Sequence, residues 1–177
     1  MTGRRFVKSS DTTVTWSRSR DEVERMLRRY GAKGFSVASD YEARRIVVRF
    51  IVPDHPGPGA HDVPVQLPVD IGRVAEALYG KPKARWRSGK WMTAFTPDQM
   101  ARAERVAWRH LVLWIDAALS AATAGMQTMT EAFFAHAVVN DRGVRLADYL
   151  QQVQGDLAPG VRALLESPAE EVTHPET

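Results

Sequence analysis

The residues with the clearest chemical potential are gathered in one short segment, from Lys81 to Trp91. Its eleven residues include five cations and two tryptophans, and none is acidic. Cations on a flexible backbone suit phosphate contacts, and an aromatic face can stack on a nucleobase for about 1–3 kcal/mol per base. The segment therefore predicts contact with single-stranded or distorted nucleic acid. The predicted contact residues in it are Lys81, Lys83, Arg85, Trp86, Arg87, Lys90 and Trp91.

Three arginines further along the chain extend this predicted surface. Arg102, Arg105 and Arg109 are spaced by three and four residues, which places them on one side of a helix. The charge balance also favours a polyanionic partner. Lys and Arg number 12 against 6 Asp and Glu in residues 1–49, 9 against 6 in residues 50–110, and 3 against 9 in residues 111–177. We expect a positive surface, with an acidic end that faces elsewhere or covers it.

The segment from Lys81 to Trp91 allows two other interpretations. Loop tryptophans often pack on a domain's own core, and loop cations often serve only to keep a surface soluble. Alternatively, Trp86 and Trp91 are anchors of a protein–protein interface, where tryptophan is enriched among the residues that carry most of the binding energy. The N-terminal residues 1–11 are predicted to be a flexible basic arm.

Two histidines and two aspartates flank a loop rich in proline and glycine and have the types that ligate a divalent transition metal. Asp54 and His55 precede the loop, and His61 and Asp62 follow it. The spacing matches no metal motif with a defined mechanism, and proline and glycine dictate a turn with polar flanks without a metal. We therefore predict a turn here, and neither a metal site nor a cofactor. A metal-dependent nuclease built from His55, His61 and distant carboxylates is the least favoured alternative.

Groups for other catalytic chemistry have no recognisable arrangement. The chain contains no cysteine, which excludes disulfides, thiolate nucleophiles, zinc fingers and iron–sulfur clusters. It also lacks a Gly-x-Ser-x-Gly nucleophile elbow and a phosphate-binding glycine loop. We predict no catalytic residue, and we expect His110 and His136 to lie at the edge of the core with one hydrogen bond each.

The apolar periodicity of the first half predicts a helix and an antiparallel sheet. Ser19 and Glu22 form a potential capping box at the start of an amphipathic helix that ends at Gly31. The strand that begins at Arg45 is apolar on both faces, so it should be central in the sheet. The predicted elements are a strand over 12–16, a helix over 19–30, strands over 34–39 and 45–52 joined by a turn at 40–42, and a strand over 63–67.

The second half is predicted to be mainly helical. Pro68 should open a helix that Gly80 ends, and Lys81 to Phe95 should form a loop. Thr96 with Pro97 and Gln99 marks the start of a long helix. The predicted elements are helices over 68–79 and 97–123, a short helix from Thr128 through Ala137, a turn at 140–143, and helices over 146–153 and 159–166.

These elements predict a single α+β domain over residues 1–166. A small antiparallel sheet with an N-terminal amphipathic helix is followed by a mainly helical C-terminal half around one long buried helix. Residues 167–177, with two prolines and three glutamates, are predicted to form a disordered acidic tail. The stretch Leu111 to Thr130 is too polar to cross a membrane, and the N-terminus has no apolar signal region, so we expect a cytoplasmic protein.

Several segments resemble a family of small uncharacterised bacterial proteins, often actinobacterial, and their phage and prophage counterparts. The matching stretches run from Arg105 through Leu113, from Gly125 through His136, from Asn140 through Tyr149 and from Ser19 through Gly34. The family has no known activity, so the resemblance implies a phage-linked or mobile-element context and supplies no catalytic residue. Asp116 departs from the pattern, because a basic residue is more usual there.

Together these patterns predict a non-catalytic nucleic-acid-binding accessory protein, of phage or mobile-element origin, that contacts DNA or RNA through the basic Trp/Arg segment. The alternative is a protein-interaction module, such as a phage or prophage adaptor or inhibitor, with the same tryptophans as anchors. Binding that weakens steeply with salt would favour the first, and a protein partner with little salt-dependent nucleic-acid binding would favour the second.

Overall fold

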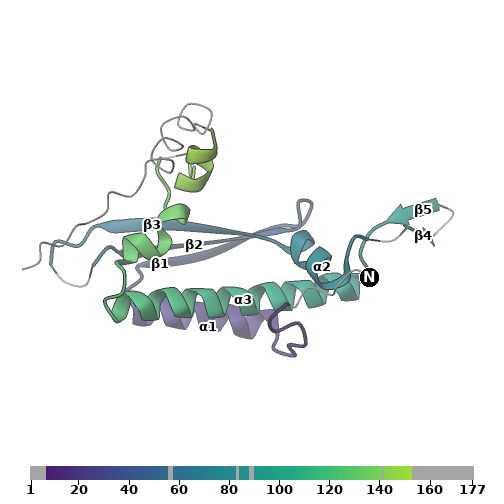
Figure 1. The fold of residues 1–177 in the computed structure, drawn as a ribbon, viewed down its shortest axis with the longest axis horizontal. Coiled ribbons are helices and arrows are strands. Elements are labelled where there is room, and N and C mark those ends of the chain that lie inside the picture. Colours follow the sequence, from purple (N-terminus) through teal and green to yellow (C-terminus); the bar gives the residue numbers. More distant parts are fainter. Residues whose placement is uncertain (1–6, 56–57, 83, 88–89, 141, 153–177) are drawn as a thin grey trace, which may run out of the picture.

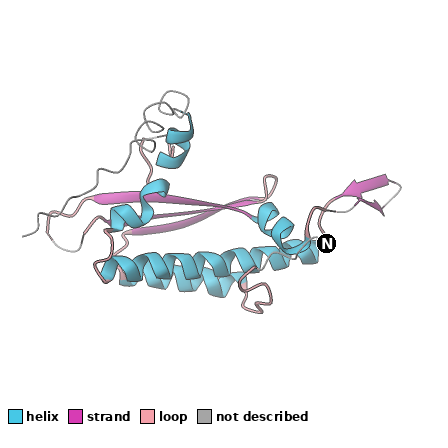
Figure 2. Cartoon of the chain, in the orientation of Figure 1, coloured by secondary structure: helices cyan, strands magenta, loops and turns pink. Residues whose placement is uncertain are grey.

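The computed structural model describes residues 7–55, 58–82, 84–87, 90–140 and 142–152. The protein is an α+β structure, with α1 and α3 lying side by side along one face of an antiparallel sheet (Figures 1 and 2). None of the described helices is long and apolar enough to cross a membrane. In chain order the elements are α1 (Trp16–Arg29), β1 (Gly34–Asp40), β2 (Arg45–Pro53), β3 (Asp62–Asp70), α2 (Ile71–Tyr79), β4 (Ala84–Arg87), β5 (Lys90–Thr93), α3 (Pro97–Thr123), α4 (Met129–Phe133) and the 3-10 turn η1 (Phe134–His136).

The main sheet has three antiparallel strands in the order β1-β2-β3, and β2 is central, as predicted. The register places Val37 opposite Val48, and Val48 opposite Leu67. Alternate residues of β2 point to opposite faces, and Val48 and Phe50 are buried while Arg49 and Ile51 are exposed. The helices therefore cover one face of the sheet, and Arg49 and Ile51 on the other face are exposed in the part of the chain that the structure describes.

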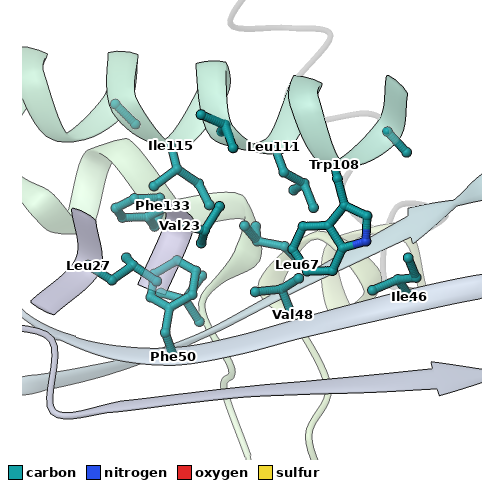
Figure 3. Close-up of a cluster of buried hydrophobic side chains, with 14 of the residues drawn as sticks. Val23, Leu27, Ile46, Val48, Phe50, Leu67, Trp108, Leu111, Ile115 and Phe133 are labelled. Carbon is teal, nitrogen blue, oxygen red and sulfur yellow. The ribbon is translucent and has the colours of Figure 1, made fainter. Parts of the chain in front are cut away.

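The core lies between the covered face of the sheet and α3 (Figure 3). Trp108 projects from α3 toward Val48 and Leu67 of the sheet, as the close-up shows, and is 1% exposed. Phe133 of α4 packs edge-on against Phe50, with ring centroids 5.3 Å apart. Large buried aromatic rings of this kind contribute much of the apolar area that a small core removes from water.

The start of α1 differs from the prediction. The helix begins at Trp16 after Thr15, whose hydroxyl accepts a hydrogen bond from the Arg18 amide at 3.4 Å, and residues 12–15 are not a strand. Ser19 lies inside the helix and is fully buried, one turn before Val23. Ser19 therefore continues the buried stripe of α1 rather than capping it, and the predicted capping box is wrong.

The start of α2 lies later in the chain than predicted. Pro68 belongs to β3 and pairs with Val47, and α2 begins at Ile71. The cap is Asp70, whose carboxylate accepts a hydrogen bond from the Arg73 amide at 3.0 Å. A proline can occupy β3 because it lies at one side of the three-stranded sheet, where some backbone N–H groups have no strand to meet. Gly80 ends the helix with a φ of 76°, as predicted.

The long helix α3 begins and ends where the sequence predicts. The Thr96 hydroxyl accepts from the Gln99 amide at 3.0 Å, and the Gln99 side chain accepts from the Thr96 amide at 2.9 Å, which completes a capping box. The helix runs for 27 residues to Thr123. It buries the side that faces the sheet, while Trp114 and Asp116 remain exposed.

After α4 and η1 the chain returns to the sheet and covers the outer side of β3. The Val138 amide donates to the Pro64 carbonyl at 2.9 Å, and the Leu146 amide donates to the Ala137 carbonyl at 2.8 Å. Thr128, the predicted start of a short helix, caps α4 through a capping box with Glu131, and Asn140 forms the predicted turn. A helix starts at Leu146 and continues to the end of the described residues at 152. The predicted helix over 159–166 and the tail over 167–177 lie outside the described residues.

The segment predicted as a loop over 81–95 contains a β-hairpin instead. Strands β4 and β5 pair antiparallel and form a separate two-stranded sheet. Figure 1 shows this hairpin projecting from the end of the body where α2 finishes and α3 begins. The prediction failed because charged residues and tryptophan alternate with no apolar period, so the pattern hides a strand that does not face the core.

Candidate nucleic-acid interface

The β4–β5 hairpin arranges the predicted contact residues by its register. Trp86 is directly opposite Trp91, and Arg87 is directly opposite Lys90. Because successive residues of a strand belong to opposite faces, the tryptophan pair and the cationic pair occupy opposite faces of the ribbon. Arg85 belongs to the same face as Arg87, opposite Met92. Lys81 precedes the hairpin, and Lys83 lies outside the described residues.

Other basic and aromatic residues lie at the same end of the molecule. The turn between β1 and β2 reaches this end beside α2 (Figure 1), and the Ile71 amide donates to the Arg44 carbonyl at 3.0 Å. Arg44, Arg45 and Arg73 are exposed, and Tyr41 at the turn is 91% exposed. These residues were not predicted from the sequence, because each is remote from the hairpin along the chain and only the topology brings them to one end.

The predicted arginines of α3 are not gathered around the hairpin. Arg102 donates through Nε and Nη2 to the Ser10 carbonyl at 2.9 and 2.8 Å, and Arg109 forms an ion pair with Glu22 of α1 at 2.7 Å. Arg105 is half-buried between them. Two of the three guanidinium groups therefore hold other parts of this chain in place.

The N-terminal segment is attached to the same helix from Val7 onward. His110 donates a ring hydrogen bond from Nε2 to the Lys8 carbonyl at 2.5 Å, next to the contact between Arg102 and Ser10. Residues 1–6, which hold Arg4 and Arg5, lie outside the described residues. Lys8 is exposed. The hydrogen bonds to Lys8 and Ser10 therefore hold this part of the predicted arm, residues 1–11, against α3.

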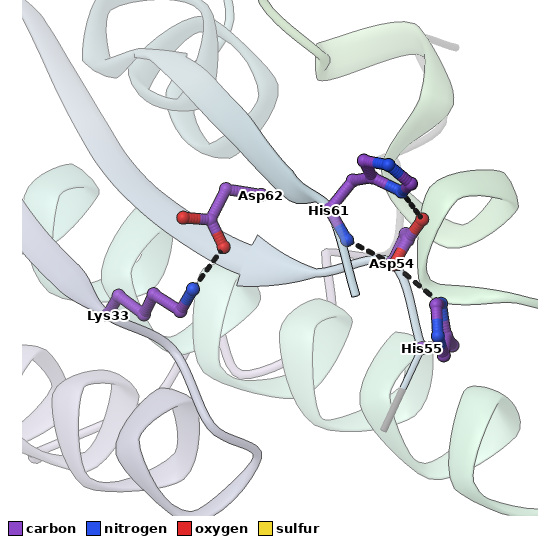
Figure 4. A network of polar contacts seen from close by, with 5 residues as sticks. All are labelled: Lys33, Asp54, His55, His61 and Asp62. Carbon is purple, nitrogen blue, oxygen red and sulfur yellow. Dashed lines mark hydrogen bonds and ion pairs between the residues drawn. The ribbon is translucent and has the colours of Figure 1, made fainter. Parts of the chain in front are cut away.

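Asp54, His55 and His61, which the sequence places around the predicted turn, form a small polar network that closes this loop (Figure 4). Asp54 accepts a hydrogen bond from the His61 amide at 2.9 Å, and its oxygens lie 2.7 Å from His55 Nδ1 and 3.3 Å from His61 Nδ1. Asp62 points away from this network and pairs with Lys33 at 2.6 Å. In the described part of the chain, no group of three His, Asp or Glu residues is arranged so that it could hold a metal ion.

Asp54 is an acceptor for both histidines. Partial desolvation raises the pKa of Asp54, but hydrogen bonds from the His61 amide and ring and the charge of His55 together bring the pKa below its ordinary value. The carboxylate therefore stays ionised and ties the two ends of the loop together. These interactions stabilise a closed turn.

A second titratable cluster lies where the C-terminal segment meets α3. Arg145 forms a bidentate ion pair with Asp148, with contacts of 2.8 and 2.5 Å, and its third nitrogen lies 3.4 Å from His136 Nδ1. The His136 ring packs edge-on against Trp114, with centroids 5.4 Å apart. Burial lowers the pKa of His136 and the charge of Arg145 lowers it further, which outweighs the opposite effect of Asp148. The cluster packs the neutral imidazole of His136, in η1, between Trp114 of α3 and the guanidinium of Arg145.

Comparisons with protein-family models, with curated proteins and with solved structures found no match to this chain. The class that the structure defines is an α+β protein with helices along one face of a three-stranded sheet and a projecting basic hairpin. The resemblance to bacterial and phage proteins stays a prediction.

Proposed function

We propose that the protein is a non-catalytic nucleic-acid-binding accessory protein that acts through the β4–β5 hairpin. One observation carries the proposal: the segment richest in cations and tryptophan forms a two-stranded ribbon that projects from the body (Figure 1). A two-stranded β-ribbon fits the major groove of a duplex, and cations along it neutralise phosphates. An isolated hairpin is only marginally stable in water, so a partner bound to it would also stabilise it.

The surroundings of the hairpin add an exposed aromatic ring but no excess of positive charge. Tyr41 is 91% exposed, whereas the exposed Arg44 and Arg45 lie beside the exposed Asp40 and Glu42, and Arg73 pairs with Asp70 at 3.7 Å. Phosphate contacts set affinity and stacking adds to it for unpaired bases. We therefore place the contact surface at the hairpin, with Arg102 and Arg109 in supporting structural roles.

The test is fluorescence anisotropy with labelled single-stranded and duplex oligonucleotides across a salt titration. Changing Arg85, Arg87 and Lys90 to alanine removes three cations from the hairpin. We expect the slope of log affinity against log salt to become shallower by about 2 to 3, since each lost phosphate contact contributes about 0.7 to 0.9. The same slope in the variant and in the unmodified protein would contradict the proposal.

A matched control removes the same charge elsewhere. Arg18, Arg20 and Arg29 are exposed on α1, and changing them to alanine should leave the slope and the affinity close to those of the unmodified protein. Equal losses in both triple variants would indicate only a response to net charge. Absence of binding by the unmodified protein at low salt would overturn the proposal, and the hairpin would then be tested as a protein-interaction module.

A further inference from the structure

The two edge strands of the main sheet differ in whether the rest of the chain covers them. On the β3 side, the chain itself supplies a cover, because Ala137 bridges Val65 and the Val138 amide donates to the Pro64 carbonyl. On the β1 side, no described residue pairs with the strand. Every second backbone N–H and C=O of β1 therefore faces outward without a strand partner.

Strand β1 has few of the features that natural edge strands use to prevent pairing. Its one charged residue is Asp40, at the end of the strand, and it contains no proline. The pairing with β2 runs one-to-one from Gly34 to Asp40, so no bulge twists the edge away. Such an edge is a template for another strand.

The apolar side chains of the core are less buried at this edge. Phe35 and Val37 of β1 share the covered face with Phe50 and Val48 of β2. The two β2 residues are buried, at 2% and 0% exposure, whereas Phe35 and Val37 are only half-buried. A further strand beside β1 would remove more of these side chains from water, which is favourable in proportion to the apolar area covered.

We propose that the partner is a second copy of this chain, bound by antiparallel pairing of the two β1 strands about a twofold axis at Val37. Full overlap of the strand with itself sets Val37 opposite Val37 of the other copy, Ser36 opposite Ala38 and Gly34 opposite Asp40. Residues with the same parity meet, so the covered faces of both copies lie on the same side of a continuous six-stranded sheet.

The charge of the strand does not oppose self-pairing. Asp40 is the charged residue of β1, and antiparallel pairing places it opposite Gly34 of the other copy. No like charges are directly opposite, which would destabilise the pair. An interface of this kind, with the same patch on both copies, is the commonest arrangement in homodimers.

The experiment compares two double variants at exposed positions of β1. S36E/A38E places glutamates directly opposite each other twice across the twofold axis, whereas S36E/A38K places glutamate opposite lysine twice. Both variants carry the same S36E change, and position 36 pairs with Arg49 of the same copy, so its effect within one copy is shared. Sedimentation equilibrium should give twice 19.8 kDa for the unmodified protein and for S36E/A38K. S36E/A38E should dimerise at least about tenfold more weakly, given the free energy of cross-strand charge pairs.

A cross-link tests the register independently. The chain has no cysteine, so Val37→Cys places one thiol in each copy, at the proposed axis. Under mild oxidation we expect a disulfide-linked dimer, and far less of it from Ser120→Cys, an exposed position on α3. A monomer at every concentration, a dimer that S36E/A38E does not weaken, or equal cross-linking of the two cysteine variants would each overturn the proposal.

Discussion

At His136 the surroundings oppose protonation. The ring is partly buried between Trp114 and the guanidinium of Arg145, and its pKa lies below the ordinary 6.5, chiefly because of desolvation. In the unfolded chain the imidazole binds a proton more readily. The unfolded state therefore takes up more protons as the pH falls, and the folded state loses stability.

This asymmetry predicts a pH-dependent stability. The stabilisation from neutral His136 is fully present above pH 6.5, the unfolded value, and it is lost as the pH falls below that value through the lowered folded pKa. His136→Gln removes the titrating group. We expect the thermal midpoint of the unmodified protein to fall more between pH 7.5 and 5.5 than that of the variant, measured by circular dichroism. Parallel pH profiles would show that His136 titrates normally in the folded state.

At the same scale, the sequence could predict some candidate residues and not others. The cations and tryptophans of the hairpin are contiguous, so composition alone singles them out. Tyr41 and Arg73 belong to the same end of the molecule only because the turn after β1 and the start of α2 meet there. No local pattern contains that information, because it depends on how the strands pair.

For α3 as an element, the capping box at its start has a measurable energetic role. Thr96→Ala removes the hydroxyl that accepts from the Gln99 amide. Loss of such a cap costs about 1 kcal/mol, and Thr96→Ser should retain most of it, since serine caps equally well. Urea denaturation would show a lower midpoint with an unchanged slope for Thr96→Ala. Equal midpoints for the two variants would mean that the cap contributes little to the stability of the fold.

The element boundaries that the sequence predicts correctly have one dominant local signal. Thr96, Pro97 and Gln99 point to a single start for α3. Near α1 the predicted cap, Ser19, is instead part of the stripe that packs into the core, and Thr15 caps the helix. Proline is typical of a helix start, yet the pairing of Pro68 with Val47 keeps this residue in β3. Tertiary packing therefore decides between local signals of similar strength.

For the whole molecule, we expect the body to fold without the hairpin. Strands β4 and β5 form their own sheet and do not extend the three-stranded one. Replacing residues 84–93 by a short Gly/Ser linker should leave the thermal midpoint nearly unchanged while nucleic-acid binding is lost. Differential scanning calorimetry and the anisotropy assay would measure the two effects. A large fall in the midpoint would show that the hairpin is part of the folded body.

At this scale the sequence predicted the class of fold well. The α+β class, the central position of β2 and the long helix α3 all follow from periodicity, which reports how each element meets the core. The hairpin was not predicted, because a ribbon that projects away from the body has no face toward the core and therefore no apolar periodicity. The open edge of β1 likewise depends on which strands have neighbours, a property of the assembled sheet.

The cover on β3 has a consequence for synthesis. The ribosome completes β3 at Asp70, but Leu146, which secures the covering segment through Ala137, is made 76 residues later. At about 5–20 residues per second, the nascent chain carries an uncovered strand for about 4–15 s. During that interval both edge strands, β1 and β3, can mispair with neighbouring chains. Speed of translation through α3, a segment far from the sheet in sequence, thus sets how long the sheet is at risk of aggregation.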